Sequence, residues 1–373
     1  MRTILLFAIL MPLIGVSQEH THMETREITF PDVPGYKTLV TDLHIHTVFS
    51  DGSVWPSIRI EEGHKDGVDV ISMTEHLEYQ PHEDDIPHPD RNRSHEIAAN
   101  AAEGSDMLVI KGSEITRSMP PGHSNAIFIQ DANKLLLDDA EEVFEEAHNQ
   151  GAFVFWNHPN YIAQKKDGVA ELTRLHKKLI ERGHLNGIEV VNEHTFSKEA
   201  LQIALDNNLT IIGTSDVHGL VDWDFNVAEG GHRPVTLVFA KERTAESVKE
   251  ALFAGKTAIW FNNLLVGKNE NLTPLIETSL QVEYAQYIGD SKVLRLAIVN
   301  YSDVDYMLLN KSEYSFHAHD NLVMIEAQSK TFLDVKTIRK KKEIDLDFQV
   351  MNAVVAPDQY ANLHFDIKVE KEE

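Results

Sequence analysis

The chain contains no cysteine among its 373 residues. Disulfides and thiolate metal sites are therefore excluded, and any metal ion must be held by histidine, aspartate or glutamate. Basic residues are also scarce, since 34 Lys and Arg face 59 Asp and Glu, which leaves a formal net charge of −25. This charge argues against a nucleic acid as partner. A phosphate group would need positive charge supplied locally, and bound metal ions are one source of it.

After its first 17 residues the chain has no apolar run that reaches the length of a membrane span. Those 17 residues combine Arg2, an apolar stretch and the small residues Gly15 and Ser17, which is typical of a cleaved secretory signal peptide. The lack of cysteine argues against a lipid anchor. We therefore expect a secreted or periplasmic protein without a membrane span, in which residues 18–37 precede the first domain.

Apolar runs typical of buried strands alternate with helix-like segments between residues 38 and 266. Strands that alternate with helices pair in parallel. About seven such units follow one another, which favours an α/β barrel over a doubly wound sheet. From residue 267 to residue 373 the runs are β-rich, with no helix-length pattern between them. This second region predicts a smaller, Ig-like β-sandwich.

Potential metal ligands follow the predicted strands at the points where the strands end. His44 and His46 alternate at the end of the first strand, so both imidazoles point to the same face. In a parallel barrel the catalytic face lies where the strands end, so we expect the ligands to converge. The later strands are followed by Glu75 and His76, by Glu114, by His158, and by Asp216 with His218.

Taken together, these blocks resemble the PHP family, which is named for its polymerase and histidinol phosphatase domains. The resemblance covers about residues 38–262 and includes all four sequence blocks of the family in order. One departure is Thr74-Glu75-His76, where many members have Thr-Asp-His, but the matching histidine is kept. The residues that carry the resemblance are His44-x-His46, Asp51, Glu75-His76, Gly112-Ser-Glu114, Gly122-His123-Ser-Asn125, His158-Pro159 and Ser215-Asp216-Val-His218-Gly219.

The resemblance implies a distorted (β/α)7 barrel with three divalent metal ions at the strand ends. Imidazole and carboxylate ligands suit Zn, Mn or Fe, and Glu114 can bridge two ions because a carboxylate has two oxygens. Asp42 and Glu75 are expected to orient the imidazoles. The ligand sets implied for the three ions are His44, His46, Glu114 and Asp216; Glu114, His123 and His158; and Asp51, His76 and His218.

A water shared by two such ions would lose a proton near neutral pH, because bound metal lowers its pKa from about 15.7 toward about 7. We therefore expect the resulting hydroxide to hydrolyse a phosphate ester, with Glu114, Asp216 and His218 as catalytic residues. Secreted bacterial members with a C-terminal β domain look like phosphodiesterases, which favours a small diester as substrate. The alternative is a phosphomonoesterase or bisphosphatase of the histidinol-phosphatase type.

Five residues outside the ligand set are candidates for substrate binding. Arg91 and Arg93 lie in a long, proline-rich loop on the catalytic side, and a guanidinium matches phosphate oxygens bidentately. Arg117 follows the third strand closely. Tyr161 and His194 also follow strand ends, where either could protonate a leaving oxygen.

Three rival functions stay open on the sequence alone. A nuclease is disfavoured by the net charge and by the lack of a basic stripe interleaved with aromatic residues. An amidohydrolase also begins its metal pair with His-x-His, but a modified lysine or a different carboxylate usually bridges its metals. A non-enzymatic binding protein, with the barrel as scaffold, would tolerate the loss of a ligand, and none is missing here.

Overall fold

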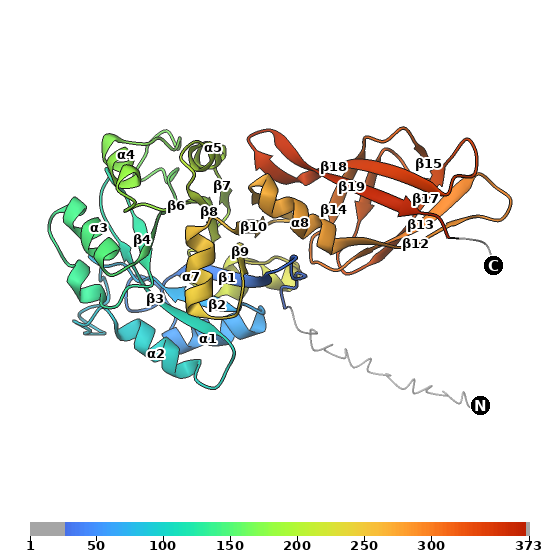
Figure 1. The fold of residues 1–373 in the computed structure, drawn as a ribbon. Coiled ribbons are helices and arrows are strands. Elements are labelled where there is room, and N and C mark those ends of the chain that lie inside the picture. Colours follow the sequence, from blue (N-terminus) through green and yellow to red (C-terminus); the bar gives the residue numbers. More distant parts are fainter. Residues whose placement is uncertain (1–26, 371–373) are drawn as a thin grey trace, which may run out of the picture.

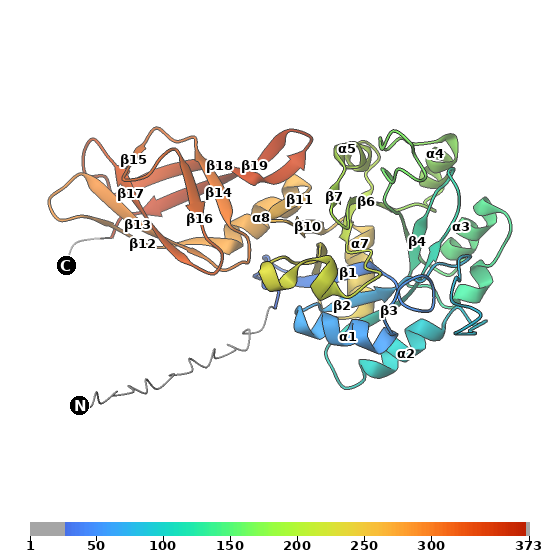
Figure 2. The same cartoon turned by 180° about the vertical axis from the view of Figure 1, so that it is seen from behind.

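The computed structural model describes residues 27–370, and the predicted signal peptide lies outside the described residues. An α/β part and an all-β part lie side by side (Figure 1), and the view from behind shows the same separation (Figure 2). The predicted fold class, an α/β domain followed by a β-sandwich, is confirmed. Within residues 27–370 no helix is long and apolar enough to cross a membrane.

The strands in the wall of the α/β part return to their starting point. The segment that follows the last strand is hydrogen-bonded to the end of the first. The amide of Asp216 donates to the carbonyl of His44 (2.9 Å), and the amide of His46 donates to the carbonyl of Val217 (3.1 Å). The strands thus enclose a distorted barrel. In pairing order they are β1 (Lys37–Ile45), β2 (Val70–Met73), β3 (Leu108–Ile115), β4 (Ser124–Ile127), β5 (Phe153–Trp156), β6 (Gly187–Asn192) and β8 (Thr210–Thr214).

The expected parallel pairing holds for most of this wall, but β4 is antiparallel to both of its neighbours. The connection explains the difference. Residues 116–123 contain no helix and lead the chain straight back beside β3, whereas a parallel neighbour needs a crossover of about a dozen residues or more.

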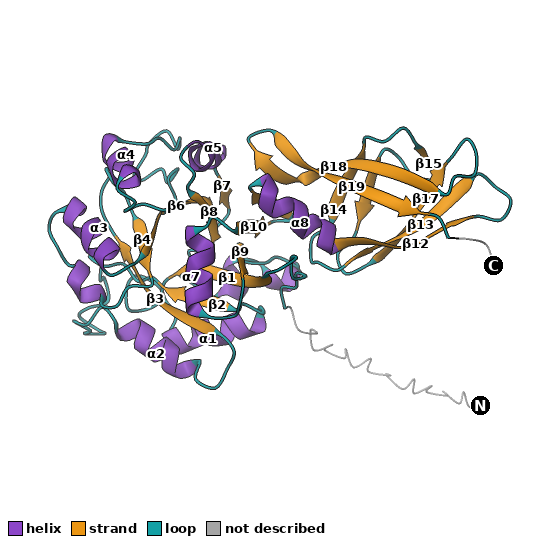
Figure 3. Cartoon of the chain, in the orientation of Figure 1, coloured by secondary structure: helices purple, strands orange, loops and turns teal. Residues whose placement is uncertain are grey.

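Helices cover the outside of the barrel (Figure 3). Several begin at a polar cap, as at Asp139 and Thr244, whose side chains accept hydrogen bonds from amides of the first turn. The covering helices are α1 (Pro56–Lys65), α2 (Arg93–Ala101), α3 (Ala140–Asn149), α4 (Arg174–Glu181), α5 (Lys198–Asp206) and α7 (Ala245–Phe253).

Helix α4 anchors itself to the barrel through the buried His176. Its Nε2 donates to the carbonyl of Pro121 (2.5 Å), and its ring packs on Trp156 with centroids 4.0 Å apart. Burial lowers the pKa of His176 to about 4, from the ordinary value of 6.5. The imidazole is therefore neutral in the folded protein near neutral pH.

This histidine should make the protein less stable in acid. Between pH 6.5 and about pH 4 the unfolded chain holds a proton on His176 that the folded chain does not. The free energy of unfolding should therefore fall as the pH drops through this window, by at most about 3 kcal/mol. Urea titrations at about pH 7 and about pH 4.5 should show a smaller loss for His176→Gln than for the wild type. An equal loss would contradict the assignment.

On the side away from β2, β1 pairs with strands that lie outside the barrel wall. Its neighbour there is β9 (Val235–Ala240), followed in the sheet by β10 (Thr257–Phe261) and β11 (Leu264–Gly267). β11 then pairs in parallel with β18 (Glu343–Ala356), with Leu265 opposite Ala353. One sheet therefore runs from the α/β part into the sandwich.

The sandwich has two sheets with antiparallel neighbours, as is usual for this architecture. The first contains β18 with β14 (Tyr306–Asn310), β16 (Leu322–Ile325) and β19 (Gln359–Lys368). The second contains β12 (Leu280–Tyr287), β13 (Val293–Asn300), β17 (Lys330–Lys336) and β15 (Ser315–His317).

A helix that the sequence did not predict, α8 (Asn269–Ser279), joins the two parts. The expectation of no helix after residue 267 is wrong at this point. Leu272, Leu275 and Ile276 are buried at the three- and four-residue spacing of a helix face. Pro274 lies inside the helix, and proline is a poor indicator of a helix interior.

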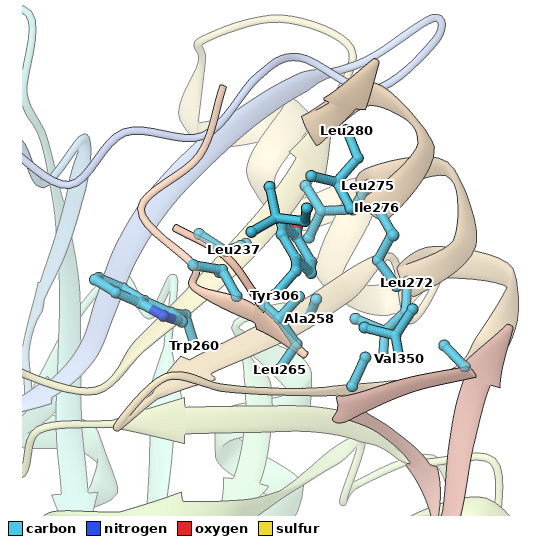
Figure 4. Close-up of a cluster of buried hydrophobic side chains, with 14 of the residues drawn as sticks. Leu237, Ala258, Trp260, Leu265, Leu272, Leu275, Ile276, Leu280, Tyr306 and Val350 are labelled. Carbon is cyan, nitrogen blue, oxygen red and sulfur yellow. The ribbon is translucent and has the colours of Figure 1, made fainter. Parts of the chain in front are cut away.

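The α/β part and the sandwich share one hydrophobic core around α8 (Figure 4). Leu237 and Ala258 come from the barrel side, Leu272 from α8, and Tyr306 and Val350 from the sandwich. Because these side chains are buried in one cluster, the sandwich is a packed continuation of the α/β part.

Candidate metal centre

Side chains from the C-terminal ends of the barrel strands meet at one place. His44 lies in β1 and Glu114 in β3, while His158 and Asp216 follow β5 and β8. The last two residues have φ angles of 29° and 48°, in the left-handed region that residues other than glycine rarely adopt. Strained backbone of this kind concentrates at functional sites.

Glu114 lies at the middle of the group and is completely buried. Its Oε1 lies 3.1 Å from Nδ1 of His123 and 3.4 Å from Nε2 of His158. Its Oε2 lies 2.5 Å from Nδ1 of His76. Asn157 donates a hydrogen bond to Oε1 (2.8 Å) and so fixes the carboxylate. The two oxygens thus face different imidazoles.

Asp216 faces the pair of histidines at the end of β1. Its Oδ1 lies 3.1 Å from Nε2 of His44 and 3.1 Å from Nε2 of His46. The two Nε2 atoms are themselves 3.0 Å apart. Three donor atoms on different side chains therefore surround one small space.

Asp51 organises a third set of donors beside the first two. Its Oδ1 lies 3.1 Å from Nε2 of His218 and 3.4 Å from Nε2 of His76. The ring of His218 also stacks on that of His46, with centroids 4.3 Å apart. The turn after β1 therefore brings its carboxylate back to the strand ends.

The donor atoms fit bound metal ions. Among the described residues, three groups of side chains have donor atoms within 4.8 Å of one another. Oxygens of Asp51, Glu114 and Asp216 are buried there without a hydrogen-bond donor, which is costly unless a cation satisfies them. The three groups are His44, His46 and Glu114; His76, Glu114 and His123; and His46, Asp51, His76 and His218. All nine predicted ligands lie together, and their assignment to individual ions stays a prediction.

Charge in this site is set by the carboxylate–imidazole pairs. At His76 burial is outweighed by Glu114 and Asp51, which raise its pKa to about 10. At His218 burial is likewise outweighed, chiefly by Asp51, and its pKa rises to about 9. Burial instead lowers the pKa of His46 to about 3. A metal ion entering the site must displace protons from the raised imidazoles, so its binding should weaken in acid.

Glu189, in the middle of β6, supports the centre and was not singled out from the sequence. Its Oε1 accepts hydrogen bonds from Nδ1 of His44 (2.8 Å) and from Thr214 (2.6 Å). Its Oε2 accepts from the amide of His158 (2.7 Å) and from Asn192 (2.9 Å). The sequence feature that could have identified Glu189 was a carboxylate inside an otherwise apolar strand.

Glu189→Gln should weaken metal binding by about 10- to 100-fold. The amide offers one oxygen where the carboxylate offers two, so His44 or the His158 amide loses its acceptor. Metal affinity measured by competition with a chelating dye checks the expectation. Glu181→Gln, on the exposed surface of α4, is the matched control. Equal affinities for the two variants would count against a supporting role.

The two carboxylates expected to orient imidazoles behave differently. Glu75 accepts hydrogen bonds from the amide of Thr47 (3.0 Å) and from Ser50 (2.6 Å). The hydroxyl of Ser50 lies 3.2 Å from Nδ1 of His46, so Glu75 acts on that ring through the serine. The prediction for Asp42 is wrong, because its carboxylate pairs with the buried Arg233 (3.1 Å) at the barrel interior.

Arg59 holds two of the ligand-bearing strand ends together. It is completely buried, and its Nε donates to the carbonyl of His46 (2.9 Å). Its two Nη groups donate to the carbonyls of Val217 (3.1 Å) and Gly219 (2.7 Å), on either side of His218. One guanidinium thus ties the end of β1 to the segment after β8.

A cavity of about 460 Å³ opens over the ligands. Apart from predicted ligands it is lined by Tyr79, Thr116, Tyr161, Asn192 and Glu193. Among the described residues no lysine or arginine lines it. The structure therefore places the predicted substrate residue Tyr161 at the site.

The other predicted substrate residues lie outside this cavity lining, and their part in substrate binding stays a prediction. His194 packs on Phe225, with ring centroids 5.1 Å apart. Arg91 donates to two backbone carbonyls of its own loop. Arg93 pairs with a neighbouring glutamate on the surface of α2 (3.0 Å), and Arg117 donates to carbonyls ahead of α3. These guanidinium groups are thus held by groups that do not line the cavity, and Arg117 also pairs with Glu78 (2.9 Å).

Comparisons with known proteins agree with this architecture. Residues 280–366 match the model of a protein family that is described as an Ig-like domain. The chain is similar to the crystal structure of a two-domain protein from Bacteroides vulgatus that contains a predicted PHP-like metal-dependent phosphoesterase. The two are 40% identical with a TM-score of 0.85, over 91% of this chain and 98% of that one. A search of curated proteins finds no match.

Two more distant structures share 16% identity with this chain. One is an amidohydrolase from Chromobacterium violaceum, with a TM-score of 0.36 over 48% of this chain and 87% of that one. The other is PsfC from Pseudomonas syringae, with a TM-score of 0.42 over 60% and 92%. Similarity this weak says nothing of the chemistry here. The Bacteroides relative and the convergent metal ligands show that the chain belongs to the two-domain, PHP-like metal-dependent phosphoesterases.

Proposed function

We propose that the protein hydrolyses a small phosphodiester at a centre of three divalent metal ions. The position of Glu114 carries the proposal. Its carboxylate is buried between separate groups of imidazoles, with one oxygen directed to each side. A carboxylate in that position can bridge two cations, and the third donor group around Asp51 adjoins it.

The charge of the cavity supports metal ions as the phosphate-binding element. Its wall carries the carboxylates of Asp51, Glu114, Glu193 and Asp216, while no lysine or arginine among the described residues lines it. Three divalent cations would bring six positive charges against those four carboxylates. The resulting positive centre suits a phosphate ester. A long polyanion would still meet the acidic surface of the protein.

The chain's own residues would hold and orient the reacting groups. When bound, the ions lower the pKa of a coordinated water and neutralise charge on the phosphoryl oxygens. Glu114 and Asp216 would hold the ions to which the reacting water binds. His218 borders the cavity, fixed by its Nδ1 donating to the carbonyl of Asp216 (2.7 Å). Tyr161 presents a phenol near His158 that can donate a hydrogen bond to the leaving oxygen.

A small diester fits better than the alternatives within this proposal. A cavity of about 460 Å³ suits a small molecule, and a diester carries one negative charge per phosphorus. Monoesters and bisphosphates bring more negative charge toward Glu193 and the acidic surface of the protein. An exported location, in the periplasm or outside the cell, would give the enzyme access to such esters from the surroundings.

Metal analysis of purified protein combined with a panel of nitrophenyl esters tests the proposal. We expect about three metal ions per chain and faster turnover of bis(4-nitrophenyl) phosphate than of 4-nitrophenyl phosphate. Turnover of the monoester alone would show that the enzyme is a phosphomonoesterase and not a phosphodiesterase. Full activity with a single bound ion would contradict the three-metal centre.

A further inference from the structure

One carboxylate in the cavity belongs to none of the three donor groups. Glu193 lines the cavity and is exposed to it. Within the described residues it has no ion-pair or hydrogen-bond partner for its side chain, and it lies outside each group of potential metal ligands. An unpaired acid at this position must face either water or the organic part of the substrate.

The backbone holds Glu193 in place at the turn between β6 and β7 (Thr195–Phe196). Its φ of 48° is in the left-handed region. Its amide donates to the carbonyl of Thr214 (3.2 Å). The preceding residue, Asn192, donates to both Glu189 (2.9 Å) and Asp216 (3.1 Å). The turn is thus tied to the metal centre, and the strain at Glu193 is of the kind found at ligand sites.

Two aromatic rings border the same cavity. Tyr79 packs edge-on against His76 and Tyr161 edge-on against His158, with centroids 5.7 Å and 5.3 Å apart. Both tyrosines are about half exposed, at 50% and 49%, so part of each ring faces the cavity. The faces of aromatic rings attract cations.

We propose that the organic part of the substrate carries an ammonium group, which binds between the carboxylate of Glu193 and the rings of Tyr79 and Tyr161. The inference rests on the proposed phosphoesterase function and narrows its substrate class to esters of a short amino alcohol. The phosphate occupies the metal side of the cavity and the ammonium its acidic, aromatic side. A substrate with a second anionic group is repelled by Glu193.

The charges around Glu193 agree with this division. Burial and then the charge of Asp216 raise the pKa of Glu193, while the imidazoles of His218, His194 and His158 lower it. No lysine or arginine of the described chain lines the cavity. An ammonium group on the substrate would give Glu193 a cationic partner of its own.

Two diesters that differ only in one charge test the proposal. The first is 4-nitrophenyl choline phosphate, and the second is its carbon isostere, 4-nitrophenyl 3,3-dimethylbutyl phosphate. We expect kcat/KM of the metal-loaded enzyme to favour the choline ester by about tenfold. In Glu193→Gln the ratio should fall to about one, and Tyr79→Leu and Tyr161→Leu should each lower it a few-fold. Glu181→Gln should leave rate and ratio unchanged.

A wild-type ratio near one would overturn the proposal. So would a Glu193→Gln variant that loses activity on both esters by the same factor, since this would indicate a structural role. A failure of the diesterase proposal can be distinguished from a failure of the ammonium proposal. If neither diester is turned over but 4-nitrophenyl phosphate is, the same comparison is made between choline phosphate and 3,3-dimethylbutyl phosphate by release of inorganic phosphate.

Discussion

Glu114→Gln should lower phosphoesterase activity by more than about a thousandfold and reduce the bound metal from about three ions to about one per chain. The amide keeps the shape of the side chain but removes the charge that faces His76, His123 and His158. The two ions assigned to Glu114 lose their shared ligand. The group around Asp51 keeps its own ligands and should retain its ion.

Activity on bis(4-nitrophenyl) phosphate and metal content by plasma emission spectroscopy, measured on the same preparation, check this result. Glu96→Gln is a suitable control, because that carboxylate is half exposed on α2 and pairs only with Arg93 (3.0 Å) among the described contacts. A Glu114→Gln enzyme that keeps three ions, or that keeps turnover with one, would contradict the bridging role.

The convergence of the ligands was predictable from the sequence because it depends on strand ends alone. In a barrel the strand ends share one face, so His44, Glu114 and Asp216 meet whatever the loops do. The placement of Arg91 and Arg117 was not predictable in this way. Each lies in an irregular segment, and its direction depends on which backbone carbonyls the fold leaves without donors.

The fold shows the same division between local and long-range effects. Alternating apolar runs predicted the barrel strands and their helices. The parallel pairing of Leu265 with Ala353 joins positions far apart in the chain, and no local pattern indicates it. Local patterns therefore predicted the sandwich but not its pairing with the α/β part.

Removing the chain after Gly267 should therefore unfold the protein rather than release an active barrel. Leu265 and Val266 are completely buried, and exposing two such side chains costs about 3–6 kcal/mol. The same cut removes the β11–β18 pairing and the apolar face of α8. Domains are stable by only about 5–15 kcal/mol. We expect insoluble or unfolded material without activity, although all nine predicted ligands remain.

Two full-length variants test whether the sandwich stabilises the α/β part or is only connected to it. Val354→Asp places a charge in the cluster that contains Ile259 and Phe261 of β10, and should lower the Tm of the whole chain in one calorimetric transition. Lys198→Ala breaks only an exposed ion pair with Asp358 (2.6 Å) and should cost less than about 1 kcal/mol. Two separate transitions, or a soluble truncated enzyme with full metal content, would show that the sandwich is dispensable. A single transition means that β18 holds β11 and β10 in place, and through β9 and β1 the histidines themselves.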